Sequence, residues 1–467
     1  MQLFTYSGAR FSPYGDEERP GTAEGLDEAG NWPAPRATTR LDARVALPGS
    51  KSLTNRELVL SALADGPSLL RRPLHSRDSM LMIEALRSLG VVIDEVDGDG
   101  TYGHDLRITP PAELSGSTSI DCGLAGTVMR FLPPVAALAL GPVAFDGDEG
   151  ARRRPMRTTI DSLRALGVEV NDDGRGALPF SLWGTGTVRG GEIAIDASAS
   201  SQFVSGLLLA AARFDEGLVL RHTGAHLPSM PHIEMTIATL AARGVRVESP
   251  EPGVWVVAPT PIAGSSVDIE PDLSNAAPFL VGAVIAGGTV AVEGWPEATT
   301  QVGADLATLL PRFGASVRRD GTRLVVDGGA GLLGGLRVPG IQLDLSTGGE
   351  LAPALVALAA LADGPSEITG IGHLRGHETD RLAALATEIN NLGGAVTELD
   401  DGLAIDPRPL HGGMWKAYDD HRMATAGAII GLAVDGVLVD DIGSTSKTLP
   451  QFPTLWHALL DQTAPSP

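Results

Sequence analysis

The feature of this 467-residue chain that most limits its fold is an internal repeat of about 75 residues. A helix-like apolar run, a glycine and an apolar strand-like segment occur six times; these glycines are Gly66, Gly141, Gly217, Gly288, Gly364 and Gly436. In a second pattern, a helical segment ends at glycine before a Val-rich segment, at Gly90, Gly167, Gly244, Gly314 and Gly393. Glycine that ends a helix typically adopts the left-handed conformation. Each unit is therefore predicted to contain strand, helix, strand, helix and strand.

The first helix of every unit is predicted to begin with polar or charged residues. These six starts contain Lys51-Ser52-Arg56, Gly126-Thr127-Arg130, Ser200-Ser201-Gln202, Asp272-Ser274-Asn275, Glu350 and Asp420-His421-Arg422. Helix capping accounts for the Ser, Thr and Asp residues. It does not account for the arginines, because the positive end of a helix dipole disfavours cations unless an anion is bound there. If the repeat brings these starts together, they form a cleft for a small polyanion.

The segment LPGSKSLTNR, at 47–56, is the strongest single candidate for an anion site. Its glycine, serines and Lys51 supply backbone N–H groups, hydroxyls and an ammonium before an apolar helical run, and Arg56 adds a guanidinium. The alternative is an ordinary helix cap made by Ser52 and Thr54. The spacing is not that of a Walker A loop.

Composition narrows the possible partners. The formal net charge of −22 and an aromatic content of 4% argue against nucleic acids and acidic membranes. The single cysteine, Cys122, excludes an intramolecular disulfide and fits a reducing cytosol; a buried, unreactive thiol is the favoured interpretation. Basic residues that bind an anion must therefore be concentrated locally.

The chain shows no targeting or membrane-spanning segment. Residues 1–35 lack a secretory signal pattern and are predicted to be a disordered extension, because they are rich in Gly, Pro and acidic residues. The longest apolar stretch, Ala276 to Val292, is short and interrupted by Pro278, Gly287 and Gly288. We expect a soluble, cytoplasmic protein.

Two glutamates are the candidates for proton transfer. Glu350 begins an apolar helix, and Glu378 lies in RGHETDRL, which also contains Asp380 and Arg381. A carboxylate in a cationic cleft can act as a general acid or base. The alternative for Glu378 is an exposed residue at a helix start.

Weaker candidates are Arg154 in ARRRPM, Ser229 and His232 in LPSMPHIEM, and Lys447 in STSKTLP. A structural role is favoured for His232. The spacing of His, Cys and acidic residues indicates no metal site, and no glycine motif indicates a dinucleotide. No metal and no cofactor are predicted.

The motifs LPGSKSLTNR, LAGTVMR, RRRPM, SASSQF, HETDR, DHRMA and TSKT together resemble, in the same order, those of the 5-enolpyruvylshikimate-3-phosphate synthase family. The resemblance implies a mixed α and β (α+β) fold, an inside-out α/β barrel with two domains of three βαβαββ units each. Domain II is expected at 51–270, domain I at 36–50 plus 271–467, and the active site between them. The implied reaction, in chorismate biosynthesis, transfers the enolpyruvyl group of phosphoenolpyruvate to the 5-hydroxyl of shikimate 3-phosphate and releases phosphate. A cofactor-free monomer is expected.

The resemblance also implies roles for individual residues. Those implied to bind shikimate 3-phosphate are Lys51, Ser52, Arg56, Ser200, Ser201, Gln202, Ser229, Glu350 and His377. Those implied to surround phosphoenolpyruvate are Lys51, Gly126, Arg154, Gln202, Arg381, Arg422 and Lys447. Those implied to be catalytic are Glu350, Glu378 and Lys51. Because Gly126 has no bulkier neighbour, we predict that the activity of the protein is sensitive to glyphosate.

Four residues depart from the family pattern. Glu350 stands where an aspartate is commoner, and His377 stands where a lysine is frequent. Leu124 replaces a polar residue, and His232 replaces the usual tyrosine.

Two other functions stay open. One is that of the sister transferase acting on UDP-N-acetylglucosamine. That enzyme would need a catalytic cysteine, and Cys122 is poorly placed for this role. The other, a non-catalytic binder of phosphate ligands, is disfavoured by the two glutamates.

Overall fold

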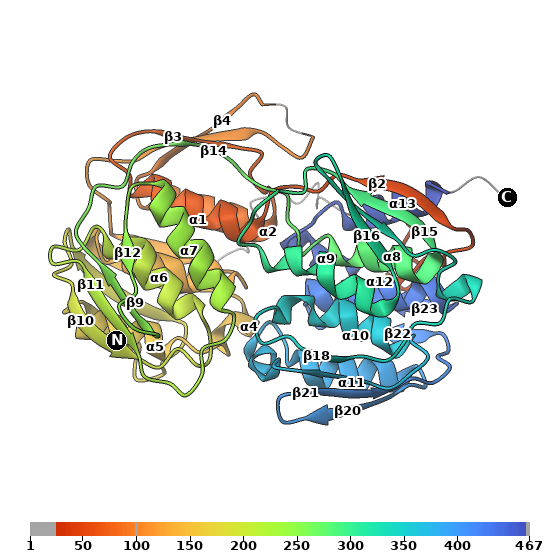
Figure 1. Ribbon diagram of the computed structural model, residues 1–467. Helices are drawn as coiled ribbons and strands as arrows, with labels where there is room; N and C mark the ends of the chain where they lie inside the picture. Colours follow the sequence, from red (N-terminus) through yellow and green to blue (C-terminus); the bar gives the residue numbers. More distant parts are fainter. Residues whose placement is uncertain (1–24, 99–100, 464–467) are drawn as a thin grey trace.

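The computed structural model describes residues 25–98 and 101–463, which fold into two lobes that lie side by side (Figure 1). Each lobe has its own hydrophobic core. The core of the N-lobe runs from Leu58 to Ile262. The core of the C-lobe combines Trp32–Leu47 with Leu273–Leu459. The predicted domains, 51–270 and 36–50 plus 271–467, stay a prediction, which these two separate cores support.

Six small sheets form the outer layers of the lobes, and five of them share one strand order. The first and second strands of a unit pair in parallel, and the fourth and third follow in antiparallel pairing. The N-lobe sheets are β14 (Ser266–Asp268), β3 (Ser68–Arg71), β5 (Asp105–Thr109), β4 (Val92–Val96); β6 (Thr118–Asp121), β7 (Leu140–Asp146), β9 (Phe180–Thr185), β8 (Glu169–Asn171); and β10 (Gly191–Ile195), β11 (Leu218–His222), β13 (Val254–Val257), β12 (Val247–Glu248). The predicted mixed fold of six units is confirmed.

The C-lobe sheets follow the same plan. They are β2 (Leu41–Val45), β15 (Gly288–Val292), β17 (Arg323–Asp327), β16 (Ser316–Asp320); β18 (Gln342–Asp344), β19 (Ser366–Thr369), β21 (Gly402–Asp406), β20 (Ala395–Leu399); and β22 (Gly413–Trp415), β23 (Val437–Val439), β1 (Trp32–Pro33). The last sheet has three strands, because the sixth unit ends in a helix and β1 supplies its outer strand.

The chain passes between the lobes twice. β2 precedes the N-lobe but pairs with β15, and β14 follows the N-lobe core but pairs with β3. The two connections touch in a bridge between Gly49 and Pro271. The backbone at Gly49 also passes close to the carbonyl oxygen of Arg72. A side chain at position 49 would collide with this oxygen, so only glycine fits there.

Apolar helices fill the lobe interiors. The central ones are α1 (Lys51–Ala62), α3 (Gly126–Ala136) and α6 (Gln202–Ala211) in the N-lobe, and α8 (Ala277–Ala286), α10 (Ala352–Ala360) and α12 (His421–Ala433) in the C-lobe. Every residue of α3, α8 and α10 is buried, as expected for helices that are apolar on all sides. Among the described residues, no helix combines the length and apolarity needed to cross a membrane.

The remaining helices lie around these central ones. In the N-lobe they are α2 (Arg77–Ser88), α4 (Glu149–Arg152), α5 (Arg157–Ala165) and α7 (Met230–Ala242). In the C-lobe they are α9 (Leu306–Leu309), α11 (Arg381–Asn391) and α13 (Phe452–Asp461), with the 3-10 turns η1 (Val302–Asp305), η2 (Leu310–Phe313), η3 (Leu332–Gly334), η4 (Gly349–Leu351), η5 (Gly372–Gly376) and η6 (Ile442–Lys447).

The glycine prediction is confirmed for the second pattern and partly wrong for the first. All five glycines of the second pattern have φ between 83° and 95°. In the first pattern, Gly66 and Gly364 are absent from the positive-φ residues. The preceding helices, α1 and α10, end at Ala62 and Ala360, and a turn separates each helix from its glycine. These two glycines therefore do not cap a helix. Gly141 and Gly288 have positive φ but lie inside β7 and β15, and Gly217 and Gly436 lie beyond the C-cap residues of α6 and α12.

The extent of the predicted N-terminal extension is also corrected. Residues 1–24 lie outside the described residues, but residues 25–35 are part of the fold. Trp32 is fully buried in the C-lobe core, and its ring packs edge-on against His457 at 6.0 Å. β1 pairs with β23 at the otherwise open edge of the sixth sheet. A buried tryptophan and a strand pairing thus order a segment that its Gly and Pro content alone predicts to be disordered.

Candidate active site

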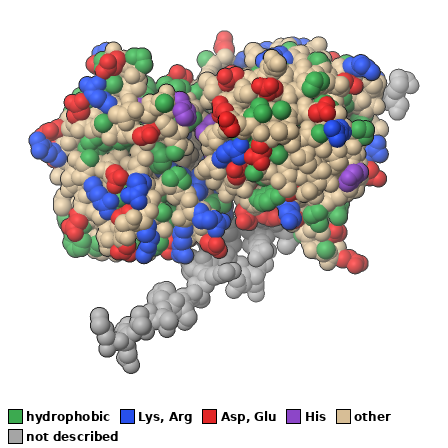
Figure 2. Space-filling model, turned by 90° about the horizontal axis from the view of Figure 1, so that it is seen from below, with side chains coloured by type: hydrophobic (Ala, Val, Ile, Leu, Met, Phe, Trp, Pro, Cys, Tyr) green, Lys and Arg blue, Asp and Glu red, His purple; other side chains and the backbone are tan. Residues whose placement is uncertain are grey.

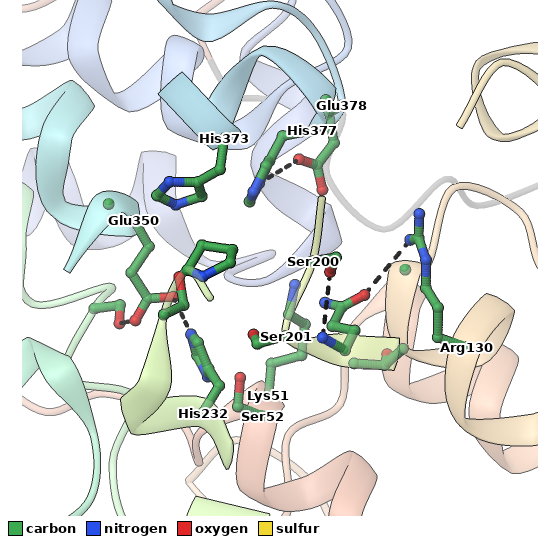
Figure 3. Close-up of a pocket in the computed structure, with 18 of the residues that line it drawn as sticks. Lys51, Ser52, Arg130, Ser200, Ser201, His232, Glu350, His373, His377 and Glu378 are labelled. Carbon is green, nitrogen blue, oxygen red and sulfur yellow. Dashed lines mark hydrogen bonds and ion pairs between the residues drawn. The ribbon is translucent and has the colours of Figure 1, made fainter. Parts of the chain in front are cut away.

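The structure brings the six predicted helix starts to one cavity between the lobes. Every residue implied by the sequence to belong to the site lines this cavity, except Lys447. The lining members of that set are Lys51, Ser52, Arg56, Gly126, Arg154, Ser200, Ser201, Gln202, Ser229, Glu350, His377, Glu378, Arg381 and Arg422. Figure 3 shows Lys51, Ser200 and Ser201 on the N-lobe wall, facing Glu350, His377 and Glu378 of the C-lobe. The predicted convergence is therefore confirmed.

The start of α1 forms the floor of the cavity. Lys51 keeps about a fifth of its side chain exposed. Arg56, by contrast, donates hydrogen bonds to Thr236 Oγ1 at 2.8 Å and to the carbonyl oxygen of His232 at 2.8 Å. Its burial lowers the pKa of Arg56 to about 9, and Glu350 opposes this shift. Arg56 thus ties α1 to α7, and a ligand carboxylate would have to compete for its N–H groups.

Two buried guanidinium groups lie at one end of the cavity. Arg130 Nη1 donates to Gln202 Oε1 at 3.5 Å, and Arg154 Nη1 donates to the carbonyl oxygen of Leu124 at 3.1 Å. Within the described part of the chain, the Nε atoms of Arg130 and Arg154 have no hydrogen-bond partner. Burial, and then repulsion by Arg154, lower the pKa of Arg130 well below its usual range. Two buried cations with unpartnered donors are suited to an anionic ligand.

Gly126 keeps this end of the cavity open. A Cβ atom there would lie 2.9 Å from Arg130 Nη1, 3.0 Å from Arg154 Nη2 and 3.0 Å from Gln202 Oε1. All three atoms belong to side chains that line the cavity. The absence of a side chain at Gly126 therefore preserves the positions of three side chains at once.

Glu378 lies among cations on the opposite wall. Its Oε2 accepts from Arg381 Nη2 at 3.0 Å, and its Oε1 is 3.5 Å from Lys447 Nζ. Burial raises the pKa of Glu378, but Lys447, Arg381 and Arg154 together hold it well below its usual range. The alternative of an exposed helix-start residue is wrong, because only 7% of the side chain is exposed.

Asp420 fixes the two arginines of this wall. It accepts two hydrogen bonds from Arg381, at 2.7 and 3.1 Å, and one from the backbone N–H of Arg422 at 2.8 Å. Arg422 Nη1 also donates to the carbonyl oxygen of Ser274 at 2.8 Å. The bidentate pair therefore orients Arg381 before any ligand binds.

Glu350 is held from both lobes. Ser274 Oγ donates to its Oε1, and His232 Nε2 lies 3.5 Å from its Oε2 (Figure 3). Burial raises the pKa of Glu350, but His232, Arg422 and Ser274 hold it below its usual range. The structural role favoured for His232 is corrected, because its side chain lies in the cavity and contacts the candidate base.

Burial holds two histidines near Glu378 neutral. Burial lowers the pKa of His373 to about 4. Burial, and then Arg381, also lower the pKa of His377 well below its usual range. At neutral pH His377 can therefore meet a phosphate as an N–H donor, but it does not supply the charge of the lysine that is frequent there in the family.

Lys447 lies behind the lining instead of in it. Its Nζ donates to the carbonyl oxygen of Leu124 at 2.8 Å and to Asp78 Oδ1 at 3.1 Å. The unusual Leu124 contributes only its backbone oxygen here, which does not depend on the side chain. This departure from the family pattern therefore leaves these contacts intact.

Several lining residues received no implied role from the sequence. They are Thr127, Arg130, Asp272, Ser274, Gln301, His373 and His421. Most of them stand at the predicted helix starts, which is the signal that could have found them. Gln301, in a loop, and His373, in η5, carry no such signal.

The described residues contain no group of three or more His, Cys, Asp or Glu side chains placed to hold a metal ion. Cys122 is fully buried, and burial raises the pKa of its thiol far above the usual range.

On the face shown in Figure 2, Lys and Arg side chains gather along the edge of one lobe, with acidic side chains among them. Exposed N-lobe arginines such as Arg152, Arg153 and Arg175 are paired with neighbouring acids. Unpartnered buried guanidinium N–H groups instead occur in the cavity.

Residues 35–456 match the protein family described as EPSP synthase (3-phosphoshikimate 1-carboxyvinyltransferase). The 3-phosphoshikimate 1-carboxyvinyltransferase of Kocuria rhizophila is 57% identical over 447 residues, which cover 94% of this chain and 99% of that protein. A solved structure of EPSP synthase from Acinetobacter baumannii gives a TM-score of 0.73 at 23% identity, covering 91% of this chain and 97% of the other. The enolpyruvyl transferase NikO from Streptomyces tendae gives a TM-score of 0.69 at 18% identity, covering 91% and 96%. At these identities the two structures show the shared fold alone.

Proposed function

The chain belongs to the EPSP synthase family and has 3-phosphoshikimate 1-carboxyvinyltransferase activity; from this premise we propose how the cavity performs the reaction. Phosphoenolpyruvate and shikimate 3-phosphate bind together between the lobes, and Glu350 and Glu378 transfer the protons. The observation that carries this proposal is the placement of two carboxylates on one cavity wall, the partly exposed Glu350 and the buried Glu378, both close to cations.

Both substrates carry a phosphate and a carboxylate, and the cavity offers a cationic or hydroxyl-rich region for each. Ser200, Ser201, Ser229 and Lys51 hold the shikimate phosphate, with Ser52, Arg56, Gln202, Glu350 and His377 along the rest of that substrate. Arg154, Arg381 and Arg422 surround phosphoenolpyruvate, with Lys51, Gly126 and Gln202 beside them, and Lys447 supports this region from behind the lining. The unpartnered Nε atom of Arg154 supports the second region.

The reaction is an addition followed by an elimination. The 5-hydroxyl oxygen bonds to C2 of phosphoenolpyruvate, Glu350 accepts the hydroxyl proton, and Glu378 delivers a proton to the methylene carbon C3. The tetrahedral intermediate then loses a proton from C3 and expels phosphate, which restores the double bond. The arginines and Lys51 stabilise the negative charge on the phosphate and carboxylate throughout.

The lowered pKa values of Glu350 and Glu378 are consistent with these roles. Glu350 and Glu378 are held ionised mainly by neighbouring cations and by His232. Two bound polyanions offset those cations, so that the pKa of each carboxyl rises on binding. Glu378 can then carry a proton, and Glu350 becomes a stronger base, only when both substrates are present.

The two lobes of the chain already meet at the cavity. The backbone N–H of Ser229 donates to the carbonyl oxygen of Ser346 at 3.2 Å across the cavity. We therefore propose that a monomer is sufficient for activity. Sedimentation during turnover tests this, and activity confined to a larger species would contradict it.

Two alternative functions fit the site less well. A transferase acting on UDP-N-acetylglucosamine would need a reactive catalytic cysteine. The thiol of Cys122 does not fit this role, because it is buried and its pKa is raised. A non-catalytic binder of phosphate ligands would be weakened by carboxylates among its cations. Neither alternative accounts for Glu350 and Glu378 as well as the transfer reaction does.

The direct test is phosphate release from phosphoenolpyruvate alone, from shikimate 3-phosphate alone, and from both together. We expect release only when both are present. Release from phosphoenolpyruvate alone, or release driven by UDP-N-acetylglucosamine instead of shikimate 3-phosphate, would contradict the proposal.

A further inference from the structure

A buried carboxylate outside the cavity lining joins the two lysines of the site. Asp78 lies in the first turn of α2, and only 1% of its side chain is exposed. Its Oδ2 is 3.4 Å from Lys51 Nζ, and its Oδ1 accepts from Lys447 Nζ at 3.1 Å. Lys51 belongs to the N-lobe and Lys447 to the C-lobe. One carboxylate of the N-lobe therefore contacts an ammonium group from each lobe.

Asp78 is itself held firmly in place. Ser76 caps α2 by accepting from the backbone N–H of Ser79, whose hydroxyl accepts in return from the backbone N–H of Ser76. The positive end of a helix dipole also favours a carboxylate in the first turn. Since Ser76 already supplies the cap, the contacts of Asp78 with the lysines are additional to the needs of the helix.

The surroundings of Lys447 show why a fixed anion matters. The charged groups that act most strongly on it are Asp78, Glu378, Lys51 and Arg154. Burial lowers the pKa of Lys447, the two carboxylates raise it, and the two cations lower it further. Without Asp78, Glu378 would be the principal anion facing Lys447, and Glu378 is assigned to proton transfer.

We propose that Asp78 is a positioning residue, which fixes the ammonium groups of Lys51 and Lys447 at the phosphoenolpyruvate end of the cavity and ties the lobes together there. This inference rests on the proposed function. Asp78 contacts neither substrate; it acts through the two lysines, and it leaves Glu378 free to exchange a proton.

The test compares Asp78→Asn with wild type, using Glu84→Gln as the control. Glu84 lies on the same helix with about half of its side chain exposed, so both variants remove one negative charge from α2. We expect Asp78→Asn to raise the KM for phosphoenolpyruvate about tenfold. The KM for shikimate 3-phosphate should rise less, because only Lys51 of the two lysines is also assigned to the shikimate phosphate. Glu84→Gln should change neither. An equal rise in both KM values, or no rise, would overturn the inference.

Two further readouts separate positioning from a structural role. In a Lys447→Gln background, Asp78→Asn should raise the KM for phosphoenolpyruvate much less than it does in the wild-type background, because Asp78 and Lys447 act as a pair. Fully additive effects of the two substitutions on this KM would contradict the inference. Loss of Asp78 also lowers the pKa of Lys447, so the basic limb of the pH profile for this substrate should move to lower pH. A basic limb that does not move in Asp78→Asn would contradict the inference.

If Asp78→Asn does not fold, Asp78→Glu provides the same test, because it keeps the charge and displaces it by one methylene. The selective rise in KM for phosphoenolpyruvate should then be smaller but present, and its absence contradicts the inference. Wild-type turnover is measured in parallel. A wild-type protein that releases no phosphate contradicts the proposed function, whereas normal wild-type turnover with unchanged KM values in the variants contradicts this inference alone.

Discussion

His232 Nε2 lies 3.5 Å from Glu350 Oε2, and this contact joins α7 of the N-lobe to η4 of the C-lobe across the cavity. The other carboxylate oxygen accepts from Ser274. The orientation of the candidate base therefore depends on both lobes, and the base is fully placed only when the lobes meet.

Replacing His232 should change the pH dependence of turnover. Glu350 accepts a proton when ionised, so its activity is present above its pKa and lost as the pH falls through it. His232 is the first of the groups that lower this pKa. In His232→Gln the pKa should rise, and the acid limb of kcat should move to higher pH in assays from about pH 4 to about pH 9. His411→Gln, an exposed histidine outside the cavity, is the control, and an unmoved acid limb in His232→Gln would contradict the role of this contact.

Gly126→Ala should weaken phosphoenolpyruvate binding selectively. The added methyl group would push on the ends of Arg130, Arg154 and Gln202, which are flexible side chains, so the fold should survive while the site is distorted. We expect the KM for phosphoenolpyruvate to rise at least about tenfold. The KM for shikimate 3-phosphate should rise less, because of the three displaced side chains only Gln202 is also assigned to that substrate.

The matched control for this variant is Gly66→Ala, because a Cβ at Gly66 meets no atom within 4 Å. It should leave both KM values unchanged. Equal effects of the two substitutions would show that Gly126 has no special relation to the arginines.

The Glu57–Arg243 pair should be essential for stability. Both side chains are buried, and Arg243 Nε donates to Glu57 Oε2 at 3.0 Å, linking α1 to the end of α7. Glu57→Ala leaves a buried guanidinium without its counter-charge, which should lower the free energy of unfolding by about 3–5 kcal/mol. Urea unfolding measures this. A loss below about 1 kcal/mol, typical of an exposed pair, would contradict the prediction.

Cys122 should be dispensable for catalysis. Its burial and raised pKa make the thiol unreactive. Cys122→Ala should keep kcat within about twofold of wild type, and thiol reagents should not inactivate the folded protein. Abolished turnover in Cys122→Ala, with an unchanged thermal midpoint, would point to a catalytic cysteine and to the sister transferase.

The repeat and the helix starts could be predicted because they depend on local chemistry. A glycine at a helix end, as at Gly90 or Gly393, marks a conformation that other residues adopt at a cost, and the structure shows positive φ at both. Arginines at helix starts pointed to an anion site for the same kind of reason. The cavity lined by those starts follows from the repetition of one unit.

What could not be predicted depends on contacts between distant segments. The burial of Trp32 depends on an open sheet edge at β23, more than 400 residues away in the chain. Asp78 looks like an ordinary first-turn residue after a serine cap, and only the fold brings Lys51 and Lys447 to it. The same holds for His232, whose partner Glu350 belongs to the other lobe.

The most direct test of the account is the turnover and substrate affinity of Glu350→Gln, which keeps the size of the side chain and removes its basicity. If Glu350 accepts the 5-hydroxyl proton, kcat should fall by about 10²–10⁴-fold, with the affinity for shikimate 3-phosphate within a few-fold of wild type. A kcat close to that of wild type would contradict the assignment of Glu350 as the base. A loss confined to shikimate 3-phosphate affinity would likewise show that Glu350 binds that substrate without taking part in proton transfer.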